Sequence, residues 1–140
     1  MASRPKDSEP IVPVCAAIIV KGDRVLVGRR KEGSPEGGKW EFPGGKPMAG
    51  EDLRACLRRE LDEELGVIAE IGDLYDVVNH RYEQRNVLLI LFRADISEVA
   101  IRSGEHDLVT WAGADELRTL DFLDADRPIV RRLIRELGDE

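Results

Sequence analysis

The chain has 140 residues, of which 42% are hydrophobic and 35% are charged, and its formal net charge is -7. This composition is typical of one folded domain with an ordinary core, and it excludes a disordered chain. The acidic balance argues against binding of nucleic acid polymers, because such binding depends on lysine and arginine meeting phosphates. A small anionic ligand is compatible with it if metal ions and local cations receive that ligand.

Residues 1–10 mix charged residues with two prolines and contain no apolar run that would serve as a signal sequence. We expect a flexible tail there, followed by a single domain over residues 11–140. The longest strongly apolar runs, at 14–20 and 87–92, are far shorter than the roughly 20 residues that a membrane helix needs. The sequence therefore predicts a protein without a membrane partner.

The two cysteines, Cys15 and Cys56, have a spacing that matches no zinc or redox motif. We expect both thiols to be buried and reduced, which is the usual state in a cytoplasm. These thiols favour a cytoplasmic protein. Both a monomer and a homodimer are open alternatives.

The first half of the chain predicts a β-hairpin. Residues 12–20 and 24–30 have strand-like apolar patterns and are separated by a turn at 21–23. Residues 31–39 hold three glycines and one proline and predict a flexible loop. This loop leads into residues 40–45, which end in a proline and two glycines.

A helix is predicted over about residues 51–65, and its inward face carries acidic residues. At about 100° per residue, an apolar stripe begins in its first two turns. Three carboxylates continue this stripe: Glu60, Glu63 and Glu64. Such a cluster would repel itself and would be costly to desolvate unless the carboxyls kept their protons or a cation lay among them. Mg²⁺, or alternatively Mn²⁺, is the simplest answer, because Mg²⁺ prefers carboxylates together with substrate phosphates.

In an alternative interpretation the helix is simply amphipathic, and its arginines and glutamates form solvated pairs. Its core face would then be rotated to three leucines: Leu57, Leu61 and Leu65. Pairing of this kind does not require Gly44 and Gly45, which allow a close backbone approach, or an acid at Glu51. We therefore favour the metal site.

The second half of the chain predicts a further hairpin, two short elements and a helix. Residues 68–78 and 86–96 have strand-like patterns on either side of the polar stretch 80–85. A polar loop at 97–107 and a short strand at 108–112 are expected next.

The C-terminal part predicts one helical turn at 114–117 and a longer helix at 127–137, where apolar residues fall at helical spacing. Asp126 precedes this helix and is expected to cap its first turn, which contributes about 1 kcal/mol. His80 and His106 have no partner spacing and are expected on the surface or in a hairpin.

The run from Gly45 to Val67 has the order G-x5-E-x7-R-E-L-x-E-E-x-G-V and resembles the Nudix box at every fixed position. This resemblance implies an α/β fold, the Nudix α/β/α sandwich with a mixed central sheet. The catalytic helix would be at about 51–65 and the C-terminal helix at about 127–137. It also implies a Mg²⁺-dependent hydrolase in which Glu60, Glu63 and Glu64 hold the metal.

Residues 40–45, W-E-F-P-G-G, resemble the entry to the box in the MutT branch, which removes damaged nucleotides from the triphosphate pool. The resemblance implies that the Gly44 carbonyl and Glu41 approach metal and nucleotide. Glu105, six residues before Trp111, resembles the loop glutamate that approaches the metal in MutT, and it is a further candidate for metal binding or general-base catalysis.

Two kinds of role follow for the remaining candidates. Arg59 would orient a carboxylate through bidentate hydrogen bonds and so organise the catalytic group. Glu63 or Glu64 would orient or deprotonate the attacking water. The positions that would contact the nucleotide in the resemblance, beside Glu41, are Arg30, Tyr82, Arg85 and Asp126.

Asp126 stands near the place where MutT carries an asparagine that reads the base. An ionised carboxylate only accepts hydrogen bonds, which favours the amino group of cytosine. A protonated carboxyl could donate to a carbonyl, as 8-oxoguanine would require.

The resulting hypothesis is a MutT-like nucleoside triphosphate pyrophosphohydrolase that forms NMP and pyrophosphate and sanitises nucleotides such as 8-oxo-dGTP, a task of DNA repair. The alternatives are a CTP or 5-methyl-dCTP pyrophosphohydrolase, a Nudix hydrolase of another nucleoside diphosphate derivative, and a nucleotide-binding module without turnover.

Overall fold

The computed structural model describes residues 10–97 and 106–138. The expected tail falls largely, and Glu105 entirely, outside the described residues. The elements, in chain order, are β1 (Ile11–Ile18), β2 (Val20–Lys21), β3 (Arg24–Arg30), β4 (Trp40–Glu41), β5 (Gly44–Gly45), α1 (Leu53–Leu65), β6 (Ala69–Arg81), β7 (Asn86–Ile96), β8 (His106–Ala112), α2 (Ala114–Thr119), the 3₁₀ turn η1 (Asp124–Asp126) and α3 (Arg127–Gly138).

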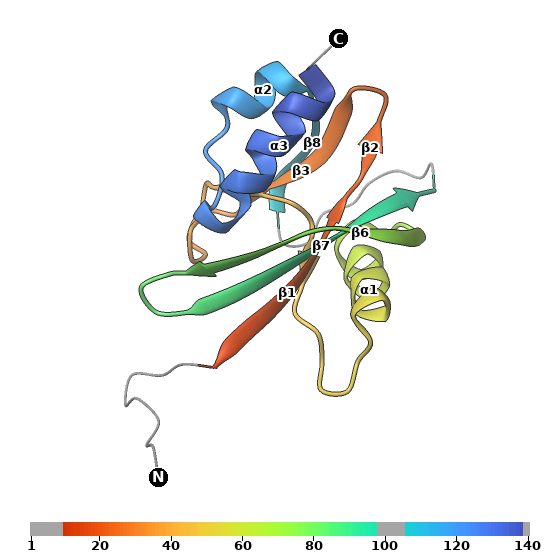
Figure 1. Cartoon of the computed structure of the whole chain (residues 1–140), viewed down its shortest axis with the longest axis vertical. Helices are drawn as coiled ribbons and strands as arrows, with labels where there is room; N and C mark the ends of the chain where they lie inside the picture. Colours follow the sequence, from red (N-terminus) through yellow and green to blue (C-terminus); the bar gives the residue numbers. More distant parts are fainter. Residues whose placement is uncertain (1–9, 98–105, 139–140) are drawn as a thin grey trace.

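The strands form two sheets. One has the order β5-β1-β7-β6, and in the other β3 lies between β4 and β8 and also pairs with β2. β1 and β7 are parallel, whereas β7 pairs with β6 and β3 pairs with β8 in antiparallel fashion. Helix α1 lies on one side of the sheets, and α2 and α3 lie on the other (Figure 1). The predicted α/β class, with a mixed sheet, a central helix and a C-terminal helix, is confirmed.

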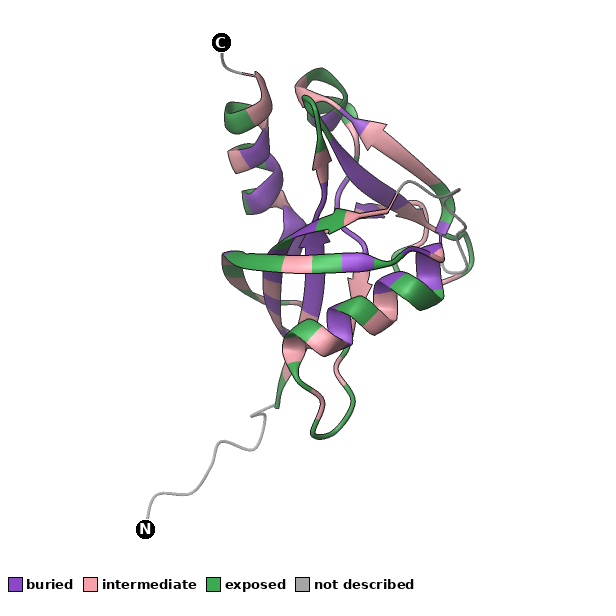
Figure 2. Cartoon of the chain, turned by 90° about the vertical axis from the view of Figure 1, so that its right-hand side faces the viewer, coloured by how far each residue is buried: buried purple, intermediate pink, exposed green. Residues whose placement is uncertain are grey.

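The two faces of the β1–β7 sheet bury separate cores, because successive residues of a strand point to opposite faces. Ala16 and Leu91 pack toward α2 and α3, whereas Cys15 and Phe92 pack toward α1. Buried positions accordingly follow the inner strands and the inward faces of the helices (Figure 2). Cys15 and Cys56 are buried free thiols, as predicted. None of the described helices is both long and apolar enough to cross a membrane.

The β6–β7 hairpin is longer than predicted, because β6 continues three residues past 78, to Arg81. Polar side chains support this extension. The Asn79 Nδ2 atom donates to Asn86 Oδ1 and to the Val87 carbonyl, each at 2.9 Å. The turn is therefore confined to residues 82–85.

The ends of α1 follow local signals. Asp52 has extended backbone and accepts a hydrogen bond from the Ala55 N–H at 3.1 Å, so the helix starts two residues later than predicted. Gly66 adopts a left-handed conformation (φ 68°) and ends the helix, as glycine commonly does.

The two glycines of β5 are required by close contacts. A Cβ atom at Gly44 would lie 1.9 Å from the Cys15 carbonyl oxygen, and one at Gly45 would lie 2.2 Å from the Glu60 carboxyl carbon. Only glycine allows β5 to pair with β1 while α1 lies against it.

A bidentate ion pair between Glu51 and Arg59 connects the loop before α1 to the helix. The Arg59 Nε and Nη2 atoms contact the two Glu51 oxygens at 2.8 Å and 2.9 Å, and the Met48 N–H donates to Glu51 at 2.9 Å. The Arg59 hydrogen bonds, and then that of Met48, lower the pKa of Glu51 from 4.5 to about 2.

This ion pair predicts a specific acid dependence of stability. Because the folded pKa of Glu51 is depressed, its stabilising contribution is present above about pH 4.5 and is lost as the pH falls toward 2. In urea unfolding at pH 6, 5, 4 and 3, Glu51→Gln should lower the free energy of unfolding at pH 6 and flatten its decline toward pH 3. Glu70→Gln, at an exposed position of β6, is the control. A Glu51→Gln protein with the wild-type pH profile would contradict the assignment.

Candidate active site

Most of the predicted site residues meet in one cleft of about 510 Å³. Its walls come from β1, the β4–β5 segment, α1, the β6–β7 hairpin and the η1 turn. The predicted residues that line it are Arg30, Glu41, Gly44, Glu60, Glu64, Tyr82, Arg85 and Asp126. Arg59 and Glu63 do not line the cleft. The cleft therefore brings together residues that are separated by up to 96 positions, from Arg30 to Asp126.

One end of the cleft is acidic. Glu64 is only 5% exposed although it carries a carboxylate, and the Glu60 side chain is 15% exposed. The two residues are one helical turn apart on α1, so both face the cleft. Gly45 lies directly against the Glu60 carboxyl group, and its missing side chain leaves room for that group.

Arg59 connects the acidic residues beneath the cleft. Its Nη1 atom contacts Glu60 at 3.0 Å and Glu63 at 3.1 Å, and its Nη2 atom donates to the Lys46 carbonyl at 3.2 Å. Together with the Glu51 pair, one guanidinium contacts three carboxylates. Arg59 thus lies where the sequence interpretation expected an organising residue.

Glu63 corrects one expectation. Its side chain is 58% exposed, so it does not continue the core-facing stripe with Glu60 and Glu64. The buried face of α1 instead combines Glu64 with the three leucines of the alternative interpretation: Leu57, Leu61 and Leu65. The reason is angular: position 63 falls on the flank of this face, within reach of Arg59 at i-4.

The donor set fits a hard cation that arrives with its own oxygen ligands. Among residues 10–97 and 106–138, no three His, Cys, Asp or Glu side chains form a group able to hold a metal by themselves. Mg²⁺, however, is usually held by one or two carboxylates plus substrate phosphates, and it keeps several waters. Glu60 and Glu64 supply such oxygens at the wall of the cleft.

The other end of the cleft carries Asp126, which is 4% exposed. Burial, and then the nearby charge of Glu41, raise the pKa of Asp126 well above its usual range. The predicted helix cap is absent: no described N–H donates to its carboxyl, because the η1 turn runs directly into α3 without an extended cap residue. Asp126 is thus disposed to keep its proton and to act as a donor.

Glu41 lies beside Asp126 and contacts two cationic or donor side chains. Arg30 Nη1 is 3.3 Å from both Glu41 oxygens, and His106 Nε2 is 2.9 Å from Glu41 Oε2. The expectation that His106 is a surface residue was wrong, since it is only 3% exposed. A lone histidine 65 positions from its partner gives no spacing signal, so the sequence did not show this contact.

The tip of the β6–β7 hairpin closes the cleft. The Tyr82 hydroxyl accepts a hydrogen bond from the Ala125 N–H at 2.9 Å, which ties the hairpin to η1. The Arg85 guanidinium lies 5.4 Å from the centre of the Tyr82 ring. Tyr82 is therefore held in place rather than being an ordinary surface tyrosine, and both side chains border the cleft.

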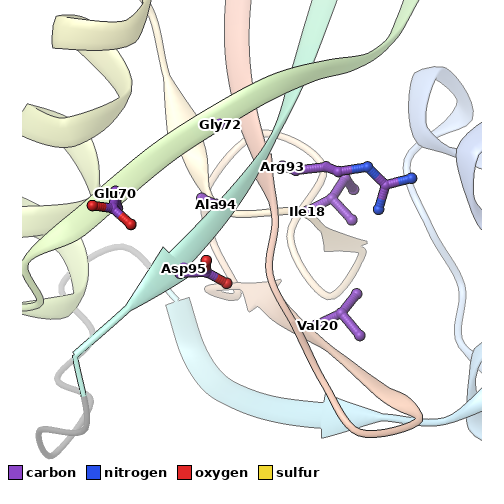
Figure 3. Close-up of a pocket in the computed structure, with 7 residues that line it drawn as sticks. All are labelled: Ile18, Val20, Glu70, Gly72, Arg93, Ala94 and Asp95. Atoms are coloured by element: carbon purple, nitrogen blue, oxygen red, sulfur yellow. The ribbon is translucent and has the colours of Figure 1, made fainter.

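A second, smaller hollow of about 230 Å³ lies elsewhere, beside β6 and β7 (Figure 3). It contains Glu70, Arg93 and Asp95, and the Arg93 guanidinium extends away from both carboxylates (Figure 3). None of the predicted site residues lines it. The large cleft is therefore the candidate active site.

The chain is similar to known proteins in both sequence and fold. The NUDIX domain family model matches residues 10–133. A Mycobacterium tuberculosis protein provisionally named 8-oxo-dGTP diphosphatase 2 is 39% identical over 130 residues, which cover 89% of each chain. The CTP pyrophosphohydrolase of Escherichia coli is 31% identical, over 86% of this chain and 89% of that one.

A solved structure shows the same fold. The MutT protein from Methanosarcina mazei superposes with a TM-score of 0.82 and 26% identity, over 94% of this chain and 98% of that one. With a family model across most of its length and relatives above 30% identity, the chain is an enzyme of the Nudix hydrolase family.

Proposed function

We propose that this Nudix hydrolase is a Mg²⁺-dependent nucleoside triphosphate pyrophosphohydrolase that releases a nucleoside monophosphate and pyrophosphate. The observation that carries the proposal is the division of the cleft. Carboxylates suited to a metal and phosphates lie at one end, with Glu60 and Glu64, and two hydrogen-bonding carboxyl groups lie at the other, with Glu41 and Asp126. A nucleotide has a matching division, with phosphates that bind metal at one end and a base with hydrogen-bonding groups at the other.

At the acidic end, Glu60, Glu63, Glu64 and the Gly44 carbonyl would hold Mg²⁺, with Glu105 as a further ligand. Mg²⁺, when bound, offsets the charge of the triphosphate and makes an attacking water more acidic. Glu64 or Glu63 would accept the proton of that water while its oxygen attacks one phosphorus of the bridge between the α- and β-phosphates. The bond from that phosphorus to the bridging oxygen would break, which releases the nucleoside monophosphate and pyrophosphate, and Glu105 is the alternative base. The position of Glu64 at the cleft wall supports it over Glu63.

At the other end, Asp126 and Glu41 would read the base. A protonated Asp126 donates to a carbonyl, whereas Glu41 offers an acceptor to an N–H group. Oxidised purines such as that of 8-oxo-dGTP carry both kinds of group, which supports a role in sanitising the nucleotide pool in the cytoplasm and so in protecting DNA. Arg30, Tyr82 and Arg85 would contact the rest of the nucleotide.

The specific alternative is a CTP or 5-methyl-dCTP pyrophosphohydrolase. It is supported by the 31% identity to a protein named CTP pyrophosphohydrolase. Cytosine also presents a donor beside an acceptor, through its amino group and ring nitrogen.

The proposed activity is tested by kcat/KM for 8-oxo-dGTP, dGTP, CTP and 5-methyl-dCTP with Mg²⁺, with pyrophosphate release as the readout. We expect turnover that EDTA abolishes and Mg²⁺ restores, and a preference for 8-oxo-dGTP over dGTP. A preference for the two cytidine nucleotides would select the alternative. No turnover of any of the four would refute the proposal and favour other nucleoside diphosphate derivatives.

A second prediction concerns the general base. Glu64→Gln and Glu63→Gln should each leave the fold intact, and the variant that removes the base should lose turnover by about a hundredfold or more. We expect the larger loss in Glu64→Gln, since Glu64 lines the cleft and Glu63 is exposed. Glu70→Gln is the matched control on another element. Near-normal kcat in Glu64→Gln would remove Glu64 from the mechanism.

A third prediction uses the raised pKa of Asp126. Its proton is lost as the pH rises through this raised value, so recognition of a carbonyl should weaken with rising pH. The ratio of kcat/KM for 8-oxo-dGTP to that for CTP should therefore fall as the pH rises through this raised pKa, and taking the ratio cancels pH effects shared by both reactions. In Asp126→Asn, which has no titrating group, the ratio should stay flat. A wild-type slope that persists in this variant would exclude Asp126 as its source.

A further inference from the structure

We propose that His106 is a positioning residue that fixes the Glu41 carboxylate at the base-reading end of the cleft, and this inference rests on the proposed function. His106 contacts Glu41 through Nε2 at 2.9 Å and is itself 3% exposed. An imidazole buried to this degree costs free energy unless its polar atoms are paired. Because the His106 ring is buried and its Nε2 atom contacts a carboxylate of the cleft, we expect the ring to hold that carboxylate in position.

The sheet register shows how His106 reaches Glu41. In the order β4-β3-β8, Gly28 of β3 stands opposite Glu41 on one side and opposite Val109 on the other. His106 belongs to β8 and pairs with Arg30, so a whole strand separates it from Glu41. The pairing of β3 with β8 shifts register between Arg29 and Arg30, and such irregularities re-aim side chains.

Gly28, which has no side chain, leaves the space on β3 that the His106 ring occupies. A Cβ atom at this position would lie 2.7 Å from His106 Cγ and 2.8 Å from Cδ2. The imidazole thus crosses β3 in the space that any other residue at position 28 would fill. The ring and the glycine form a matched pair, and this pair explains why a buried histidine of β8 contacts a residue of β4.

Glu41 needs such a support because its other partner is less constrained. Arg30 contacts both Glu41 oxygens at the longer distance of 3.3 Å, and its side chain is 31% exposed. The charge of Glu41 also acts on the nearby Asp126. Held by Arg30 at the edge and by His106 from the core, the carboxylate presents one fixed orientation to the base.

This arrangement predicts that His106 affects nucleotide affinity and base selectivity more than the chemical step. His106→Phe keeps a ring over Gly28 and removes the contact to Glu41. Its kcat/KM for the preferred nucleotide should fall about tenfold, the scale of one hydrogen bond to a charged group, mainly through KM. The selectivity between the best and worst nucleotides of the panel should fall with it. His106→Gln, which retains a donor, should restore part of both.

Three further variants make the test specific. Gly28→Ala should displace the ring and reproduce the KM increase. Leu108→Ala, at an exposed position of β8, should behave as wild type. In a Glu41→Gln background, His106→Phe should cause less than about a twofold further change, because the two residues act as a unit. Thermal unfolding of each variant identifies any that fail to fold.

The inference is overturned if His106→Phe lowers kcat at unchanged KM, if its effect is undiminished in Glu41→Gln, or if folded His106→Gln is as impaired as His106→Phe. A readout independent of turnover is the ¹⁵N resonance of His106 Nε2, which should move in Glu41→Gln and stay in place in Glu70→Gln, the exposed control on β6. Absence of turnover in the wild type would refute the proposed function alone, and the resonance would then decide whether His106 is coupled to Glu41.

Discussion

The rest of the structure depends on the placement of Arg59 among carboxylates, which carry the same charge as one another and would otherwise repel. Its guanidinium carries five N–H donors in a rigid fork, and they are distributed over Glu51, Glu60, Glu63 and the Lys46 carbonyl. Without this cation, carboxylates brought together by one helix and its preceding loop would repel one another. With it, the loop, the helix and the acidic end of the cleft form one unit. The two carboxylates on the helix, Glu60 and Glu63, stay at its margin, where ligands can reach them.

Helix α1 must satisfy two demands that conflict. Its inward face has to bury apolar area against β1 and β7, and it also has to bring carboxylates to the cleft. The helix does both by placing Glu64 within the buried arc while Leu57 and Leu61 fill the core. This arrangement works because β5 consists of two glycines, which allow backbone where a side chain would collide with Glu60. The glycines of β5 and the carboxylates of α1 therefore depend on each other: the missing side chain at Gly45 is what leaves room for the Glu60 carboxyl group.

Local and periodic features were predictable from the sequence, and long-range side-chain contacts were not. The cap at Gly66 and the C-terminal helix depend on neighbouring residues and apolar spacing, which the sequence displays directly. The mixed α/β architecture was implied by the resemblance of residues 45–67 to the Nudix box. The exposure of Glu63 depends on how far the helix rotates against the sheet, and a wheel of 100° per residue places that residue at the boundary. The burial of His106 depends on a register shift in β3 and β8 and on a glycine 78 positions away, neither of which has a periodic signature.

The two carboxyl groups at the far end of the cleft show how one type of side chain can supply opposite hydrogen-bonding roles. Glu41 has Arg30 and His106 as partners, so its negative charge is compensated. Asp126 has no such cation within the described residues and faces Glu41, so both its burial and its neighbour favour the protonated form. An acceptor and a donor side by side match a base edge on which an N–H group adjoins a carbonyl or ring nitrogen. Under the proposed function, the residues that surround Glu41 and Asp126 would therefore determine which base is selected, because they set the hydrogen-bonding role of each carboxyl group.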